Sequence, residues 1–466
     1  MITDIVKDIN SKKDVLILGY GREGKATYNL IRKYLKDKKL TIADSNIKLL
    51  EINPELKQDE NLDFILGENY LDNLNRYDMI IKSPGVNFKY INYSEIENKI
   101  TSQIDLFLKH TKAKTIGVTG TKGKSTTSSL IYHVLKSMKI DAVLAGNIGI
   151  PIFEELDKIN EDTIVILELS CHQLQFVNYA PNISVLLNLY EEHLDLYKSY
   201  HEYQKAKLNI FSKQKDNDYK VWNLDNVDLK KWYYESNNTY VYSSDKLNIK
   251  NGILINEDGL YLVKNKEEKL VYDKTRKRNL LGNHNLYNIA ASLCVCDILG
   301  LDIDVVSKHV DSFKSLEHRM ELVGTYNGIT FYNDSIATIP NATISCIKSI
   351  NNLSTVIIGG MNRELNLDEL INYLNETDKI KTCIFLKDTG YMICDKLLSM
   401  GCDKNLYKAE DMKDAVKYAY LNTNKGYACA LSPAAASYNT YKNFEERGKD
   451  FKELVKIFNK KLSEKE

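Results

Sequence analysis

The sequence lacks the features that mark membrane proteins, secreted proteins and chains with long linkers. Only six of its 466 residues are proline, too few for a proline-rich linker between domains. No run of about 18 apolar residues occurs, so no membrane-spanning helix is expected. The opening residues "MITDIVKDIN" have no apolar core of the kind found in secretion signals. These absences predict a cytoplasmic protein with no membrane partner.

Excess charge of one sign and the C-x-x-C motif are also absent. Lys plus Arg and Asp plus Glu both number 63, so the formal net charge is zero and no nucleic-acid partner is expected. Eight cysteines are scattered without a C-x-x-C motif, and the nearest two are Cys294 and Cys296. Because no secretion signal is present, we expect buried thiols that are neither disulfide partners nor zinc ligands.

The sequence does contain a repeated alternation of short apolar runs and longer helical stretches. Val, Ile and Leu dominate runs such as "DVLIL", "KTIGVTG", "DTIVILELS" and "STVIIGG". This alternation predicts an α/β fold with mainly parallel sheets. A chain of 466 residues exceeds one ordinary domain, and we expect three, at residues 1–102, 103–314 and 315–466. Each predicted strand ends in small or polar residues, where open α/β sheets bind ligands.

The segment "GVTGTKGKST" (residues 117–126, the phosphate loop) joins a predicted strand to a predicted helix. Gly120 and Gly123 permit a tight turn with inward-pointing N–H groups. Lys124 supplies a cation for the β- and γ-phosphates, and the serine or threonine after it offers a hydroxyl to Mg²⁺. Val118 stands where the general G-x-x-x-x-G-K-[ST] pattern has its first glycine, so a structural turn with an incidental lysine is an alternative. We predict ATP binding.

A second glycine turn, "GYGREG" (residues 19–24), lies in the N-terminal segment. Its glycines have G-x-G-x-x-G spacing, and Asp44 follows the last of them by 20 residues, as in dinucleotide-binding folds. A dehydrogenase would need hydride chemistry downstream, where the chain instead offers an ATP site. We therefore interpret this turn as the holder of a nucleotide-linked substrate, with a purely structural turn as the alternative.

Three chemically capable residues follow the phosphate loop. Glu168 ends a predicted strand and can reach Mg²⁺ beside the loop. His193, with Asp195 close by, follows the next strand, and Lys207 lies on a predicted helix. Taken singly, each has a simpler interpretation as a helix-start, loop or solvated residue. Their order along the chain favours one shared site.

Together these motifs resemble the Mur ligase family, in particular its glutamate-adding branch. The resemblance runs through nearly the whole chain, in the order "GYGREG", "IKSPGV", "GVTGTKGKSTT", "GNIG", "LELSCHQLQ", "NLYEEHLDLY", "YQKAK", "GNHNLYNIAA", "LEHRME", "YNDSIATIP", "IIGG" and "LSPAAASYNTYKNFEERG". It implies a UDP-binding first domain, a central P-loop ATPase domain and a Rossmann-like third domain for the amino acid, in a monomer. It also implies that ATP phosphorylates the carboxylate of UDP-N-acetylmuramoyl-L-alanine, and that glutamate then displaces phosphate, in peptidoglycan precursor synthesis.

The resemblance further assigns roles to individual residues. ATP would contact Gly120, Thr121, Lys122, Gly123, Lys124, Ser125, Thr126, Asn288, Arg319 and Asp334. The catalytic residues would be Lys124, Asn147, His193 and Lys207, with Asn147 at the acyl end of the substrate. One Mg²⁺ would bind Ser125 and Glu168, and a second would bind His193 and a carbamylated Lys207, an oxygen ligand that a hard cation prefers. The UDP group would contact Arg22, Glu23, Asp44, Ser83, Pro84 and Gly85, and glutamate would contact Thr338, Arg363, Ser437 and Phe444.

Four residues depart from the family pattern: Glu23, Glu192, Ile336 and Arg363 replace Ser or Thr, Asp, Lys and Lys. Two of them lie near the implied amino-acid pocket, so D-glutamate is our leading prediction and L-glutamate the alternative. A dehydrogenase leaves the phosphate loop unexplained. A non-catalytic nucleotide-binding protein would be favoured if Lys124, Glu168 or His193 were missing, and all three are present. Folate polyglutamate synthases resemble the central domain but lack the first one.

Overall fold

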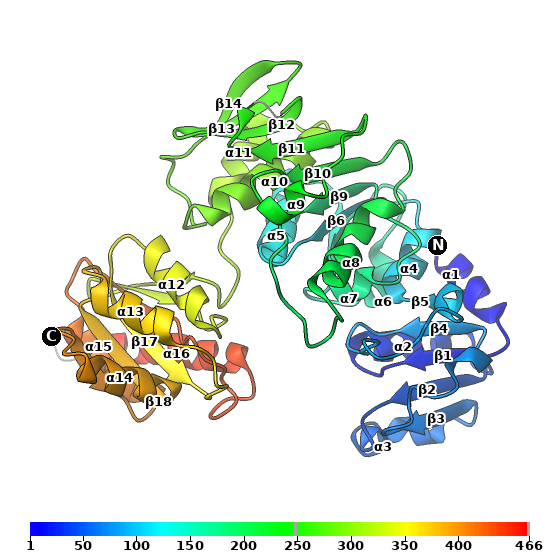
Figure 1. The fold of residues 1–466 in the computed structure, drawn as a ribbon, viewed down its shortest axis with the longest axis horizontal. Helices are drawn as coiled ribbons and strands as arrows, with labels where there is room; N and C mark the ends of the chain where they lie inside the picture. The colour runs from blue at the N-terminus through cyan, green and yellow to red at the C-terminus, as the bar shows by residue number, and fades with distance from the viewer. Residues whose placement is uncertain (247–248, 464–466) are drawn as a thin grey trace. The chain divides into compact units, whose positions relative to one another are not determined.

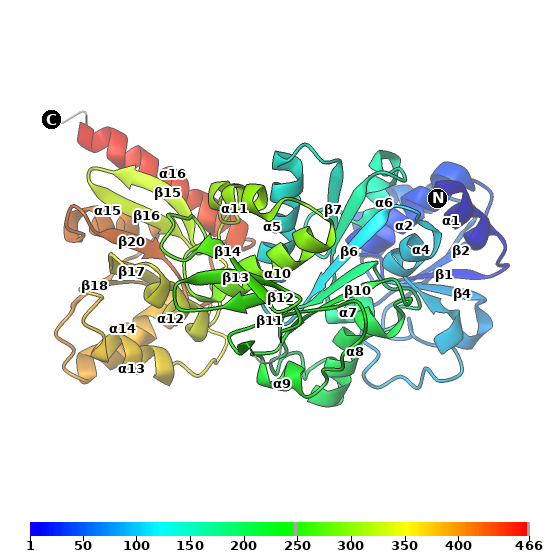
Figure 2. The same cartoon turned by 90° about the horizontal axis from the view of Figure 1, so that it is seen from above.

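The computed structural model describes residues 1–246 and 249–463. The chain divides into two compact units, which are described separately. The first unit comprises residues 1–276 and 286–310, and the second comprises residues 277–285 and the chain from Asp311 onward. Figures 1 and 2 show the elements of each unit.

The N-terminal part of the first unit is built on a five-stranded, fully parallel sheet in the order β3-β2-β1-β4-β5. Strand β1 is buried at all four positions, as expected for the apolar run "VLIL" in a sheet covered on both faces. The strand order reverses between β1 and β4, so both glycine-containing turns that follow these strands lie at a switch point where ligands bind. The elements are α1 (Ile2–Asn10), β1 (Val15–Leu18), α2 (Arg22–Tyr34), β2 (Leu40–Asp44), α3 (Leu49–Ile52), β3 (Leu62–Leu66), β4 (Met79–Lys82), β5 (Ile100–Thr101) and α4 (Gln103–His110).

The remainder of the first unit surrounds a nine-stranded sheet in the order β14-β13-β12-β11-β10-β9-β6-β8-β7. It is parallel from β7 to β12, and β13 and β14 add an antiparallel edge. Strand β6 lies between β8 and β9, so the ends of these three strands are neighbours. The strands are β6 (Lys114–Thr119), β7 (Ala142–Gly146), β8 (Ile164–Glu168), β9 (Ile183–Leu186), β10 (Tyr219–Asn223), β11 (Thr239–Ser243), β12 (Asn251–Ile255), β13 (Gly259–Lys264) and β14 (Glu267–Asp273).

Helices α7, α8 and α9 of this part begin after residues whose side chains cap them. Helix α7 has a capping box, in which Ser170 and Gln173 satisfy each other's backbone N–H groups. Helix α8 begins after Ser199, whose hydroxyl accepts from the Glu202 amide. The helices are α5 (Lys124–Ser137), α6 (Ile152–Glu155), α7 (Cys171–Leu174), α8 (Tyr200–Ser212), α9 (Val227–Lys230), α10 (His284–Ile298) and α11 (Ile303–Ser312).

The second unit contains a six-stranded sheet in the order β15-β16-β20-β17-β18-β19, parallel except for the β15–β16 pair. Strand β17 is buried along its whole length, because helices α12 to α14 pack on one face of the sheet and α15 and α16 on the other. The elements are β15 (Glu321–Tyr326), β16 (Ile329–Asn333), α12 (Pro340–Ser349), β17 (Leu353–Gly360), α13 (Asp368–Glu376), β18 (Thr382–Asp388), α14 (Thr389–Ser399), β19 (Asn405–Lys408), α15 (Met412–Asn422), β20 (Ala428–Leu431) and α16 (Phe444–Ser463).

The α/β class with mainly parallel sheets is confirmed. Each of the three expected segments carries one sheet, and the boundaries near residues 102 and 314 stay a prediction. All eight cysteines are free thiols; seven are buried, and Cys402 is only partly buried, which corrects that expectation. No helix among the described residues has the length and apolarity needed to cross a membrane.

Candidate functional site

A cavity of about 370 Å³ (the substrate cavity) opens at the switch point of the N-terminal sheet. It extends to the loop after β7, so it joins the two sheets of the first unit. All six residues predicted to contact the UDP group line it, and so does Asn147: Arg22, Glu23, Asp44, Ser83, Pro84, Gly85 and Asn147. The structure therefore brings the predicted nucleotide holder and the predicted acyl-end residue into one space.

Close backbone contacts shape the wall of this cavity. A side chain at Gly24 would place its Cβ only 2.0 Å from the Gly19 carbonyl oxygen, so the turn requires glycine there. The Ser83 hydroxyl donates to the same carbonyl at 2.7 Å and ties the two turns together. The Asp44 carboxylate accepts the Tyr20 and Asn46 amides at 2.7 and 2.8 Å, so it also braces the backbone around the cavity.

Glu23 lines the substrate cavity, and its carboxyl group is buried but only partly hydrogen-bonded. One of its oxygens accepts from Gln173 Nε2 at 2.7 Å, and the other is buried with no hydrogen-bond partner among the described residues. Burial raises the pKa of Glu23 to about 7. Burial also lowers the pKa of the neighbouring Lys82 to about 8, and the Lys82 ammonium lies 5.4 Å from the Phe88 ring centroid. Near neutral pH this wall therefore holds a carboxyl group that is part protonated and part charged.

The phosphate loop is held by the strand next to it. Asn188, just after β9, accepts the Lys122 amide at 2.8 Å and donates to the Lys122 carbonyl at 2.9 Å. Helix α5 begins at Lys124, directly after Gly123. Gly123 has a φ of 87°, which glycine adopts without steric cost. The Lys124 ammonium donates to the Gly120 and Thr121 carbonyls at 2.9 Å each. Asn288 lies beside this turn and accepts from the Thr127 hydroxyl at 3.2 Å.

Glu168 ends β8, next to the strand that leads into the phosphate loop. It is 1% exposed; its Oε1 accepts from Asn147 Nδ2 at 2.7 Å, and its Oε2 has no hydrogen-bond partner among the described residues. A buried carboxylate oxygen without a donor is suited to a cation, because burial is costly unless the charge is paired. Asn147 therefore connects the substrate cavity to this acid, in addition to its predicted contact with the substrate.

Lys207 lies buried under the phosphate loop. Its ammonium donates to the Gly120 carbonyl at 2.9 Å, the same oxygen that Lys124 contacts. Burial, followed by the Lys124 charge, lowers the pKa of Lys207 to about 7. Tyr203 covers Lys207, with its ring centroid 5.1 Å from the ammonium, and donates to or accepts from the Thr121 hydroxyl at 2.8 Å.

His193 is partly exposed and has a φ of 60°, which non-glycine residues rarely adopt. Its ring lies 6.0 Å from the Tyr203 ring and 5.3 Å from the His172 ring, measured between centroids. The predicted His193 and Lys207 thus both lie near the Tyr203 ring. Asp195 is exposed, as expected for a solvated loop residue.

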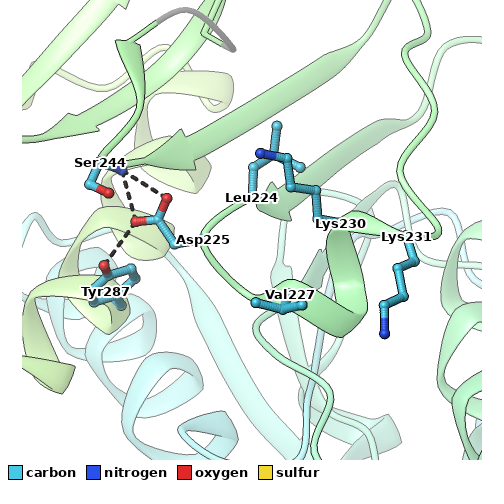
Figure 3. A pocket seen from close by; sticks show the side chains of 7 residues that line it. All are labelled: Leu224, Asp225, Val227, Lys230, Lys231, Ser244 and Tyr287. Atoms are coloured by element: carbon cyan, nitrogen blue, oxygen red, sulfur yellow. Dashed lines mark hydrogen bonds between the residues drawn. The ribbon is translucent and has the colours of Figure 1, made fainter.

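A second cavity, of about 490 Å³, lies at the ends of β10 and β11 (Figure 3). Asp225 dominates its polar wall, and its carboxylate accepts from the Ser244 amide and the Tyr287 hydroxyl, both at 2.8 Å at the closest. Lys230 and Lys231 lie on its other side. The Asp225 carboxylate already accepts hydrogen bonds from donors of the protein itself. Among the described residues, this cavity therefore offers room for a ligand but no unpaired carboxylate.

In the second unit, the predicted residues cluster at the ends of β16, β17 and β20. Asp334 is buried; it accepts the Met320 amide at 3.1 Å and the Ser432 hydroxyl at 2.9 Å, and burial raises its pKa to about 6. Arg319, whose charge acts on Asp334, has a buried Nε without a hydrogen-bond partner among the described residues. Thr338 and Phe444 are partly buried, Ser437 is buried and Arg363 is exposed.

Two residues that organise these sites were not predicted from the sequence. Gln173 bonds to Glu23, and Arg447, 1% exposed, bonds through its guanidinium to Ser335 and to the Ala435 carbonyl at 2.8 to 3.0 Å. Arg447 thereby fixes the loops after β16 and β20 against each other. Both residues lie inside recognised motifs, "LSCHQLQ" and "NFEERG", and that position was the only available signal.

The chain is similar to known proteins of one family. Residues 118–296 match the Mur ligase middle domain, and residues 318–435 match the Mur ligase, glutamate ligase domain. The chain is 34% identical over 467 aligned positions to UDP-N-acetylmuramoylalanine--D-glutamate ligase of Acetivibrio thermocellus, covering 97% of this chain and 98% of that one. It is also 34% identical to the Clostridium botulinum protein of the same name, over 96% of this chain and 98% of the relative.

Two solved structures share the fold. The MurF ligase of Thermotoga maritima in complex with ADP has a TM-score of 0.58 at 18% identity, covering 97% of this chain and 96% of that one. UDP-N-acetylmuramate-alanine ligase MurC of the same organism has a TM-score of 0.58 at 20% identity, covering 95% and 99%. Because two Mur ligase domains match and relatives at 34% identity cover 96 to 97% of the chain, the protein belongs to the Mur ligase family.

Proposed function

We propose that this chain adds D-glutamate to UDP-N-acetylmuramoyl-L-alanine in peptidoglycan precursor synthesis, with ATP cleaved to ADP and phosphate. One observation carries the proposal: the substrate cavity runs from the nucleotide-type glycine turn to Asn147, whose amide bonds to Glu168 beside the phosphate loop. A nucleotide-linked acid bound at the turn would thus end close to the site of phosphoryl transfer. The D-isomer is supported by relatives that are named D-glutamate ligases.

In the proposed reaction the alanine carboxylate attacks the γ-phosphorus of ATP. The bond between the γ-phosphorus and the bridging oxygen breaks, and ADP leaves an acyl phosphate behind. The glutamate amine then attacks the acyl carbonyl, and phosphate leaves with the electron pair of the C–O bond. Lys124 would exchange its bonds to the loop carbonyls for bonds to the β- and γ-phosphates.

The described residues fit the cations that the family implies. Ser125 and Glu168 would hold the first Mg²⁺, since Glu168 has a buried oxygen without a donor. His193 and Lys207 would hold the second, with Lys207 carbamylated so that it offers oxygen instead of a positive charge. Bound Mg²⁺ neutralises charge that develops on the transferred phosphoryl group. Thr338, Arg363, Ser437 and Phe444 are proposed to receive glutamate.

The test is phosphate release from ATP with UDP-N-acetylmuramoyl-L-alanine, comparing D- and L-glutamate. We expect release with D-glutamate at least roughly 100-fold faster than with L-glutamate, because the isomers present the amine differently to one fixed pocket. Lys124→Ala should slow release by roughly 100-fold or more. Lys136→Ala, which alters an exposed lysine on the same helix, is the matched control. No release with either isomer would refute the substrate assignment, and faster release with L-glutamate would refute the stereochemistry.

A further inference from the structure

Three side chains that can bind metal, one cysteine and two histidines, converge beside the proposed Mg²⁺ sites. Cys171 and His172 begin α7, and His193 follows β9; each offers one ligand atom, and the three atoms lie within 4.8 Å of one another. We call these three residues the Cys–His cluster. Cys171 is 2% exposed and His172 is partly buried, whereas His193 is exposed, at 42% of its side chain.

Tyr197 orients the cluster. Its hydroxyl lies 3.3 Å from His172 Nδ1, and the two rings stack with centroids 5.5 Å apart. The same hydroxyl interacts with the Cys171 thiol, so one side chain positions two of the three ligands. An imidazole whose one nitrogen is held by a hydrogen bond presents the other to a metal, which is the usual arrangement around histidine ligands.

A comparable group of three side chains in the second unit is a poorer candidate for a metal site. Glu317, His318 and Glu321 also lie within ligand distance of one another. Lys452 already supplies a cation there, because its ammonium bonds to Glu317 and Glu321 at 2.6 and 2.9 Å. In the Cys–His cluster, no Lys or Arg of the described residues donates a hydrogen bond to Cys171 or His172, although the Lys82 and Lys207 charges act on both side chains. His193 pairs with the carboxylate of Glu192 at 3.6 Å.

We propose that Cys171, His172 and His193 form a binding site for a thiophilic divalent cation, of which Zn²⁺ is the representative. One thiolate and two imidazoles are a ligand set that Zn²⁺ prefers, whereas Mg²⁺ prefers oxygen ligands. Zn–S and Zn–N bonds of about 2.3 and about 2.1 Å place ligand atoms about 3.5 Å apart in a tetrahedron. The three ligand atoms lie within 4.8 Å of one another, so the side chains must rotate to bring them to that spacing. The site revises the expectation that no cysteine binds zinc.

The site has a consequence for activity, and this consequence rests on the proposed function. His193 cannot bind both the second Mg²⁺ and a cation held by Cys171 and His172. Zn²⁺ in the cluster would therefore remove a ligand from the Mg²⁺ site and inhibit phosphate release. The binding site itself does not depend on the proposed function, so the two can be tested separately.

The binding test uses Co²⁺ as a coloured substitute for Zn²⁺ with the purified full-length protein. We expect one Co²⁺ per chain, with an intense thiolate-to-cobalt charge-transfer band and the visible bands of a four-coordinate ion, all displaced by added Zn²⁺. Cys171→Ala should lose the charge-transfer band, and His172→Gln should weaken binding at least tenfold. Cys402→Ala, which changes a partly buried cysteine in the second unit, should keep the full spectrum.

Circular dichroism of each variant shows whether it is folded, and a loss of the band counts only in a folded variant. A charge-transfer band that survives in folded Cys171→Ala, or wild-type protein that gives no such band, would overturn the proposal. In the activity assay, Zn²⁺ should inhibit the wild type at least tenfold more strongly than Cys171→Ala, relative to the uninhibited rate of each. If Zn²⁺ inhibits both proteins equally while the wild type binds Co²⁺ as expected, the proposed effect on activity is wrong and the proposed binding site still stands.

Discussion

Glu23 is a buried carboxyl group in a cavity proposed to receive a nucleoside diphosphate. Since its pKa is about 7, raised from 4.5 by burial, the charged form dominates only above neutral pH. A charged carboxylate repels a diphosphate, whereas the protonated acid can donate to it. We therefore expect the KM for the UDP substrate to rise severalfold between about pH 6 and about pH 8. Glu23→Gln should flatten this profile, and Glu68→Gln, at an exposed site in the same sheet region, should leave it unchanged.

The Glu23 carboxyl group should also make the free energy of unfolding depend on pH. Because the folded-state pKa lies above the ordinary value of 4.5, the folded state binds the proton more tightly, and its stability falls as pH rises from about 4.5 to about 7. Glu23→Gln removes this dependence. Relative to the wild type, the variant should gain stability in urea unfolding as pH rises through that window. A constant difference between the two proteins across the window would contradict the burial of the charged form.

Substitution of Lys207 tests whether its side chain is carbamylated, as proposed. Lys207→Ala should reduce phosphate release strongly, because it deletes the proposed oxygen ligand of the second cation. An added short carboxylic acid should restore part of the rate by occupying the space that the side chain leaves. Lys205→Ala, at an exposed position of the same helix, should need no rescue. If no small acid restores the rate of the folded variant, Lys207 acts through its amine and the carbamate is wrong.

At the scale of elements, the phosphate loop depends on one glycine for two reasons. Gly123 has a φ of 87°, and a Cβ there would lie 2.5 Å from Asn288 Oδ1. Gly123→Ala should therefore displace the turn and weaken ATP binding at least tenfold in calorimetric titration. Gly401→Ala is the matched control, since Gly401 has a φ of 70° but open space around it. It should cost about 1 kcal/mol of stability and leave ATP binding intact; equal losses of affinity would refute the steric argument.

Strands with continuous apolar runs were predictable from the sequence. The edge strands that pair with them, and the contacts between distant residues, were not. Strands such as β6 and β17 are buried on both faces, which produces the uninterrupted Val and Ile runs that identify them. The antiparallel edge was missed because β14, "EEKLVYD", is mostly exposed and carries no such run. Motifs located the phosphate loop and Glu168. The bond from Gln173 to Glu23 spans 150 residues, and no local pattern encodes a contact at that separation.

At the scale of the whole molecule, the hydrophobic cores lie within single units. Among the described residues, one extended cluster and two smaller ones lie in the first unit, and two clusters on opposite faces of one sheet lie in the second. Units with separate cores can unfold separately. We therefore expect two transitions in scanning calorimetry of the full chain, one of which matches the transition of a fragment that begins at Asp311.

The UDP substrate should then act on one transition only, because the substrate cavity is lined entirely by residues of the first unit. At a concentration of about 100 times its Kd, a ligand that binds only the folded state adds about 2.7 kcal/mol of stability. This gain should raise the midpoint of the transition that the fragment lacks and leave the other midpoint in place. Glu23→Gln, measured in parallel, reports whether the shift follows binding at the cavity. A shift of both midpoints by the substrate alone would mean that the two units unfold as one, and would contradict their separate cores.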